Sequence, residues 1–244
     1  MNKLSVIIPA RNEADNLKEC ISEICKELTD HSIDFEILVI DDASTDNTID
    51  IIKEIRKSVA SVKCLKTEDE SGFGRAVRLG LDNFTGDAVA IMMADRSDSP
   101  KDLVCYWGCI KDGNDCVFGS RFMRGGKVYN YPLLKLLANR VVNTIIRFAF
   151  NIQCNDITNA FKMYRREVIE GCKPLISPHF NLTVEIPLKA VIRGYSWKVV
   201  PISWKNRDKG VTKLKLREMG SRYFFIIAYL WLEKYFSRGD YRRK

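Results

Sequence analysis

Short apolar runs alternate with helix-like segments through the first hundred residues of this 244-residue chain. The runs cover residues 4–8, 35–40, 62–65 and 88–93, and the segments between them repeat apolar residues at helical spacing. A strand that is apolar at every position is buried on both faces, as in a parallel sheet whose strands are connected by helices. The alternation therefore predicts an α/β fold, with a Rossmann-like, mainly parallel, doubly wound sheet and helices on both faces.

The second half of the chain is less regular but continues the same domain. Apolar patterns predict strands at residues 117–119 and 197–202, and helices at residues 133–150 and 181–192. A basic and aromatic helix is expected from about residue 214. With no internal repeat and no low-complexity linker, we expect one domain over residues 1–215 and a C-terminal amphipathic helix over residues 216–244.

Acidic residues follow two of the expected strands. Asp41 and Asp42 are adjacent after one strand, and Asp95 and Asp98 follow another. The carboxyl ends of parallel strands share one edge of a sheet, which is where such sheets bind ligands. A lone aspartate at a strand end usually caps a helix, but two clusters on one edge favour a site for nucleotide hydroxyls, base N–H groups or a divalent cation.

Sequence blocks around these acids resemble the family 2 glycosyltransferases, which have the GT-A fold. They are SVIIPARNE at residues 5–13, VIDDASTD at residues 39–46, and Asp95 after its strand. Three later blocks are similar to the branch typified by dolichyl-phosphate mannosyltransferase and related polyprenyl-phosphate glycosyltransferases: GSR at residues 119–121, DITNAFK at residues 156–162, and RDKGVTK at residues 207–213.

The resemblance implies a donor site for a nucleotide sugar. The residues that would bind the nucleotide are Pro9, Ala10, Arg11, Glu13, Asp41, Asp42, Ala94 and Asp95. Asp95 matches the second acid of the family's Asp-x-Asp motif, whereas Met93 stands in place of the first. We therefore expect Mg²⁺ or Mn²⁺, held less firmly than usual, by Asp95 with Ser97 or Asp98.

The acceptor side is expected to be basic. The chain carries a net charge of +8, and residues 116–155 contain several Arg and Lys residues but no acid. By resemblance, Arg121 and Arg140 would bind an acceptor phosphate, while Arg207 and Lys213 would close over the diphosphate. The expected catalytic residues are Asp95, Arg121 and Asp156, and Asp156 either orients a sugar or holds its own loop. Glu185 is either buried beside an arginine or exposed.

The C-terminal helix combines aromatic rings with basic flanks. Its apolar stretch at residues 223–232 is shorter than the ~20 residues needed to span a bilayer. It is suited to lying on an anionic membrane surface, and the alternative is docking on the domain or on a second subunit of a homo-oligomer. The eight cysteines form no CxxC pair, and Met1 leads directly into a strand. We therefore expect reduced thiols and a cytoplasmic protein, peripheral on the cytoplasmic face of a membrane.

The resemblance, together with the acidic edge and the basic acceptor region, implies an inverting glycosyltransferase that moves a hexose from GDP-mannose or a UDP-sugar to a polyprenyl phosphate. An enzyme with a sugar-hydroxyl acceptor is the first alternative, although it needs a carboxylate base that the sequence does not single out. A binding protein that has lost catalysis is the second, supported by Met93 alone. Nucleic acid is not an expected partner, because no recognition motif accompanies the positive charge.

Overall fold

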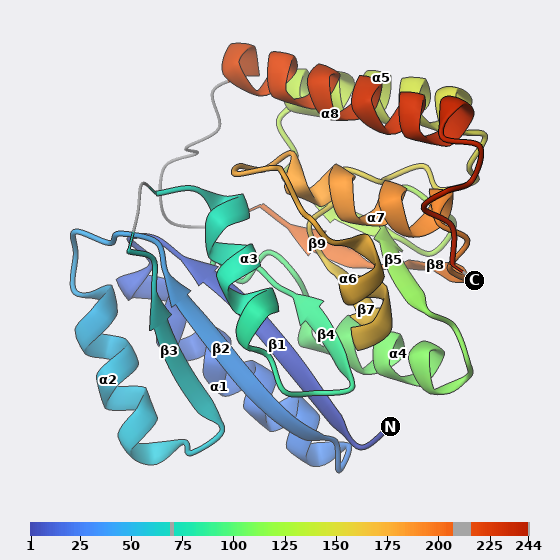
Figure 1. Ribbon diagram of the computed structural model, residues 1–244. Coiled ribbons are helices and arrows are strands. Elements are labelled where there is room, and N and C mark those ends of the chain that lie inside the picture. Colours follow the sequence, from blue (N-terminus) through green and yellow to red (C-terminus); the bar gives the residue numbers. More distant parts are fainter. Residues whose placement is uncertain (69–70, 207–215, 244) are drawn as a thin grey trace.

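The computed structural model describes residues 1–68, 71–206 and 216–243, and the side chains of the last helix from Gly220 onward. The elements follow one another in an α/β succession (Figure 1). In chain order they are β1 (Lys3–Ala10), α1 (Ala14–Asp30), β2 (Asp34–Asp41), α2 (Thr48–Ser58), β3 (Val62–Lys66), α3 (Phe73–Asn83), β4 (Ala88–Ile91), α4 (Pro100–Lys111), β5 (Cys116–Ser120), β6 (Lys127–Tyr129), α5 (Leu133–Phe150), β7 (Lys162–Arg165), α6 (Arg166–Cys172), α7 (Leu182–Ile192), β8 (Trp197–Pro201), β9 (Ser203–Lys205) and α8 (Leu216–Phe236).

Seven strands form one mixed sheet in the order β3-β2-β1-β4-β7-β5-β8. All neighbouring strands are parallel except β7, which runs antiparallel to both β4 and β5. The register of β1 with β2 ends with Ala10 beside Asp41, so the polar segments after both strands begin at the same edge. The expected mainly parallel, doubly wound sheet is confirmed.

The core has two layers because alternate strand residues face opposite sides of the sheet. Val6 and Ile8 of β1 pack with buried residues of α1, α2 and α4, whereas Ile7 packs with residues of α3, α6 and α7. Continuous burial of both faces explains why these strands are apolar at every position.

Helices α5 and α8 lie side by side as a further layer, on the side of α7 away from the sheet (Figure 1). Ile226 and Leu230 attach α8 to the core, and Glu233 pairs with Arg193, which lies just after α7. The C-terminal helix is therefore docked on the domain, which was one of the two expected outcomes. None of the helices in the described part of the chain combines the length and apolarity needed to cross a membrane.

Candidate active site

The segments after β1, β2 and β4 each hold one residue in the left-handed region of backbone conformation. These residues are Asn12, Ala43 and Arg96, with φ of 51°, 54° and 60°. Non-glycine residues rarely adopt this conformation, and in folded proteins such strain concentrates at binding sites. The first two segments are also joined, because Asn12 Oδ1 accepts a hydrogen bond from the backbone N–H of Thr45 at 2.7 Å. The edge predicted to bind the donor is thus tightly built.

Asp41 and Asp42 have different partners at this edge. The Asp41 side chain is completely buried, and its Oδ1 accepts a hydrogen bond from the Ser44 N–H at 3.3 Å. Its Oδ2 has no hydrogen-bond partner among the described residues. The Asp42 carboxylate instead accepts from the backbone N–H of Gly72, at 2.8 and 3.0 Å. Asp41 therefore presents an unused acceptor, whereas Asp42 fixes the turn that begins α3.

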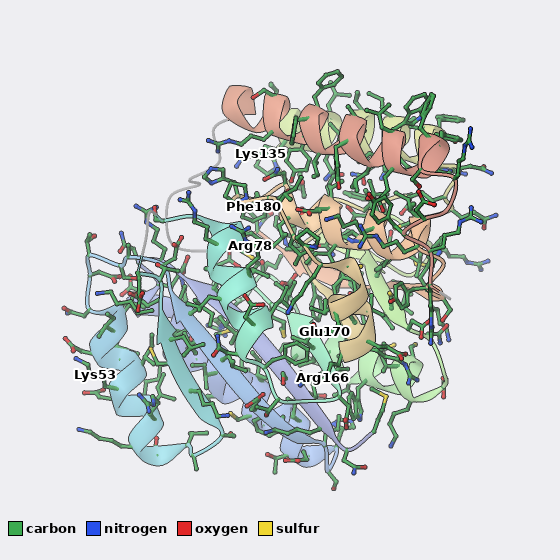
Figure 2. All side chains as sticks on the ribbon, viewed as in Figure 1. Lys53, Arg78, Lys135, Arg166, Glu170 and Phe180 are labelled. Atoms are coloured by element: carbon green, nitrogen blue, oxygen red, sulfur yellow. The ribbon has the colours of Figure 1, made fainter. Side chains whose placement is uncertain are left out.

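Two glycines allow the start of α3 to meet the segment before α7. A Cβ added to Gly72 would lie 2.5 Å from the carbonyl oxygen of Pro178, and one added to Gly74 would lie 2.4 Å from that of Ser177. The adjoining rings of Phe73 and Phe180 stack with their centroids 4.1 Å apart. Figure 2 places Phe180 between the start of α3 and the layer formed by α5 and α8. Backbone contact is the reason for glycine at both positions.

A small acidic cluster follows β4. Asp95 accepts a hydrogen bond from the Ser97 N–H at 3.1 Å, and Asp98 accepts one from the Met93 N–H at 3.2 Å. All three polar residues, Asp95, Ser97 and Asp98, are buried. Burial and then the charge of Asp95 raise the pKa of Asp98 to about 7. Two carboxylates that repel one another at the predicted donor edge would be stabilised by a cation.

The donor atoms available at this edge fit a hard cation. Within the described ranges, no group of three or more His, Cys, Asp or Glu side chains could hold a metal. Mg²⁺ usually takes only one or two carboxylates and completes its shell with substrate phosphates and water. Asp95 with Asp98 meets that requirement, and Ser97 is adjacent. Met93 contributes only its backbone, so the first acid of the motif has no substitute at that position.

Arg121 forms a buried ion pair with Asp156. Its backbone N–H, Nε and Nη2 donate to the two carboxylate oxygens at 3.0, 2.8 and 2.7 Å. Asp156 is fully buried and Arg121 nearly so. Burial, which lowers the pKa of Arg121, is outweighed by the hydrogen bond and the charge of Asp156, so the pKa is raised. The rings of Phe122, Tyr131 and Trp204 surround the guanidinium at 5.4–5.6 Å.

Arg140 lies close to this pair. Its Nη1 donates to the backbone oxygen of Asn155 at 2.8 Å, and its guanidinium lies 4.7 Å from the ring centre of Phe122. The structure thus brings together two expected acceptor residues on one aromatic ring. At the donor edge, Ala10 and Ala94 are buried, Pro9 and Glu13 are partly buried, and the exposed Arg11 donates to Ser71 at 2.7 Å. Arg207 and Lys213 lie outside the described residues.

Two further charged residues are buried, although neither was predicted as a site residue. Lys162 donates to the backbone oxygens of Asn159 and Thr183, and burial lowers its pKa to about 8. Glu185 is fully buried and pairs with Lys189 at 2.7 Å, so the arginine partner considered from the sequence is wrong. The signal available for Glu185 was an acid within an otherwise apolar helix pattern. No comparable signal marked Lys162, since it was included only as the end of a motif.

The sequence profile described as "Glycosyl transferase family 2" matches residues 5–172, which span β1 to α6 and include every acidic residue of the edge described above. The chain belongs to this family. Its fold is the GT-A fold of the solved neighbours. The chain is similar to the solved glucosyl-3-phosphoglycerate synthase from Mycobacterium tuberculosis, crystallised with Mn²⁺, UDP-glucose and phosphoglyceric acid. The TM-score is 0.68 at 19% identity, over 96% of this chain and 79% of that one.

Two curated relatives are more similar in sequence. A dolichol-phosphate mannosyltransferase from Pyrococcus furiosus is 34% identical over 218 residues, which are 87% of this chain and 59% of the relative. A polyprenol monophosphomannose synthase from Mycolicibacterium smegmatis is 31% identical over 218 residues, which are 86% of this chain and 80% of the relative. The chain thus spans less than two thirds of the first relative's length, and most of the second's.

Proposed function

We propose that this family 2 glycosyltransferase moves a hexose, with mannose the leading candidate, from a nucleotide diphosphate sugar to a polyprenyl phosphate. The observation that carries the proposal is the likeness to two relatives named for this chemistry over 86–87% of the chain. The geometry supports it, because an acidic donor edge and a basic, aromatic acceptor region lie at neighbouring strand ends.

Asp41 binds the nucleoside of the donor in this proposal. Its Oδ2 is buried without a partner among the residues that the structure describes, and a base N–H or a ribose hydroxyl would supply the missing donor. Asp42 acts indirectly, since its carboxylate holds the turn at Gly72. The segments after β1 and β2 are joined by a hydrogen bond between Thr45 and Asn12. This bond keeps the Asp41 carboxylate in place before the nucleotide sugar binds.

Asp95 and Asp98 face the diphosphate in the proposed reaction. A divalent cation bound there would offset the negative charge that grows on the departing nucleoside diphosphate. Asp95 would hold it, with Asp98 or Ser97 next to it. The remaining ligands would come from the diphosphate and water, because Met93 offers no carboxylate.

The acceptor phosphate attacks the anomeric carbon as an anion. One phosphate oxygen forms the new bond to that carbon while the bond from the carbon to the leaving diphosphate breaks, so the configuration inverts and no proton moves. A general base is not required. The charge of Arg121 is largely neutralised by its ion pair with Asp156. Arg140, beside it, therefore supplies the additional positive charge that binds the acceptor phosphate.

The layer formed by α5 and α8 is the proposed contact with the membrane. Along α5 five apolar residues that recur every three or four positions are more than half exposed: Leu134, Leu137, Val141, Ile145 and Phe148. Leu133, at the start of the helix, is exposed as well. In α8 the exposed residues include Phe224, Leu232 and Phe236. An apolar surface of this kind is unusual on a monomer and is typical of helices that lie in the headgroup region. It would bring the enzyme to a lipid acceptor and keep the protein peripheral.

The test is transfer of sugar from radiolabelled GDP-mannose, UDP-glucose or UDP-GlcNAc to a short polyprenyl phosphate, with Mg²⁺ or Mn²⁺. We expect mannolipid from the wild type and none from Asp95→Ala. The control is Asp50→Ala, which changes an exposed aspartate of α2 and should give the wild-type yield. Absence of any glycolipid from the wild type with all three donors would refute the proposal. Product on a sugar hydroxyl but not on the lipid would redirect it to the alternative acceptor.

A further inference from the structure

A pocket of about 320 Å³ lies between the segment that precedes α7 and the first described turns of α8. The first wall includes Ser177 and Asn181, and the second includes Arg222 and Phe225. Its volume is in the range of small-ligand sites. The wall residue Pro178 also meets Gly72, which Asp42 holds, so the pocket adjoins the donor edge on the side toward α8.

The backbone of the first pocket wall is fixed by hydrogen bonds to a buried side chain of α7. The buried carboxylate of Glu185 accepts the backbone N–H groups of Ile176 at 2.8 Å and Ser177 at 2.7 Å. Lys189 donates to the same carboxylate and to the backbone oxygen of Pro174. This buried network fixes the backbone but leaves the Ser177 hydroxyl unused. A wall supported in this way is preorganised for a ligand.

Two buried polar side chains on this wall each carry an atom with no hydrogen-bond partner among the described residues. Ser177 and Asn181 are 1% and 4% exposed, yet Ser177 Oγ and Asn181 Oδ1 have no hydrogen-bond partner among the described residues. Asn181 stands at the N-cap of α7 but makes no side-chain cap bond in the described structure. Buried polar atoms are nearly always paired, and the two unpaired atoms belong to residues that line one pocket, so they point to a ligand bound there.

The chemistry of these atoms selects the ligand class. A carbonyl oxygen such as Asn181 Oδ1 needs a hydrogen-bond donor, and a serine hydroxyl both donates and accepts. A fully ionised phosphate only accepts, so it would leave Asn181 Oδ1 unpaired. Sugar hydroxyls both donate and accept, and the exposed ring of Phe225 offers an apolar face for the C–H side of a sugar ring. Arg222, half-buried at the rim, adds a further donor.

We propose that this pocket binds a sugar ring, with Ser177 and Asn181 pairing its hydroxyls and Phe225 covering one face. The ring could belong to the nucleotide-sugar donor or to a separate glycoside. The first of these alternatives rests on the proposed function. The shared chemistry is a set of vicinal hydroxyls, and the experiment separates the two sources.

The first measurement is saturation-transfer NMR of the full chain with methyl α-D-mannoside, methyl α-D-glucoside and methyl α-D-galactoside. We expect saturation of at least one glycoside, a fivefold or greater loss in Ser177→Ala and Asn181→Ala, and no loss in the matched surface variant Asn83→Ala. Both pocket variants should melt at or above the wild-type temperature, because each removes an unpaired buried group. A melting temperature at or above that of the wild type would show that the loss of saturation does not come from unfolding.

The second measurement compares calorimetric binding of GDP with GDP-mannose, and of UDP with UDP-glucose. If a nucleotide sugar binds more tightly than its nucleotide, and Asn181→Ala removes the difference, the ring is the donor's. If glycosides bind while that difference is absent, the pocket takes a sugar from another source. No saturation of any glycoside, unchanged saturation in both variants, or displacement of the glycoside by inorganic phosphate would overturn the proposal. Both measurements detect binding and not sugar transfer. A failure of the transferase assay would therefore leave the result for this pocket unchanged.

Discussion

Removing Asp156 should expose how strongly the site depends on its buried ion pair. Asp156 is fully buried and receives three hydrogen bonds of 2.7–3.0 Å from Arg121, whose side chain is 7% exposed. Asp156→Ala leaves a guanidinium buried without its counter-ion. Breaking a buried pair from one side costs about 3–5 kcal/mol of unfolding free energy. For a chain of this length that corresponds to a melting temperature lower by about 6–20 °C.

The assay is calorimetric and denaturant unfolding of the wild type, Asp156→Ala, Arg121→Met and the double variant. The double variant should cost at least about 2 kcal/mol less than the two single changes together, because removing both charges leaves neither unpaired. Asp50→Ala, which breaks the exposed pair of Asp50 with Lys53, is the control and should hardly change the melting temperature.

Additive costs within about 0.5 kcal/mol would refute the reasoning. Arg121 and Asp156 would then contribute to stability independently of one another. The charge of Arg121 would be as available to an acceptor phosphate as that of a solvated arginine. A strong coupling instead supports Asp156 as the residue that orients Arg121. Arg140 then becomes the side chain whose loss most reduces the affinity for acceptor phosphate.

Three further perturbations test other parts of the structure. Asp41→Asn should weaken nucleotide binding by about 10- to 100-fold, the loss of one charged hydrogen bond, in a titration with GDP or UDP, and intact affinity would contradict its role. Gly72→Ala and Gly74→Ala should each lower the unfolding free energy by about 1–3 kcal/mol through backbone overlap, whereas Gly108→Ala, with open space around it, should raise it by about 0.5–1 kcal/mol. Glu36 is buried, and its hydrogen bonds outweigh burial and lower its pKa from 4.5 to about 2. Its stabilisation of about 3 kcal/mol is therefore complete above pH 4.5 and lost as the pH falls toward 2, and Glu36→Gln should flatten this part of the pH–stability curve.

The sequence was most informative where one local rule decides the structure. Strands β1, β2 and β4 are buried on both faces, so their apolar runs identified them, and the acids that follow them lie at one edge as predicted. The range predicted for α5 is the one observed, because its apolar residues keep a helical period from Leu133 to Phe150. Both results depend only on periodicity and on the geometry of parallel sheets.

The parts that the sequence did not predict depend on contacts between distant segments. β7 reads Lys-Met-Tyr-Arg, which has no continuous apolar run, and it is a strand because it fits between β4 and β5. That antiparallel insertion follows the 156–162 motif and helps to bring Asp156 to Arg121, 35 residues earlier. The sequence indicated both residues for the site, but their pairing could not be derived from spacing alone.

Unpaired polar atoms are concentrated in one region of this protein. Across the part of the chain that the structure describes, three buried side-chain atoms have no hydrogen-bond partner, on Asp41, Ser177 and Asn181. Asp41 precedes the residue that holds Gly72, and Gly72 and Gly74 contact the backbone beside Ser177. Elsewhere even a deeply buried acid such as Glu36 is fully paired. Each unpaired group costs about 1–3 kcal/mol, so a region that gathers three of them is destabilised unless a ligand completes it. If the donor's sugar reaches Ser177 and Asn181, binding of a nucleotide sugar should therefore raise the melting temperature by more than binding of the nucleotide alone.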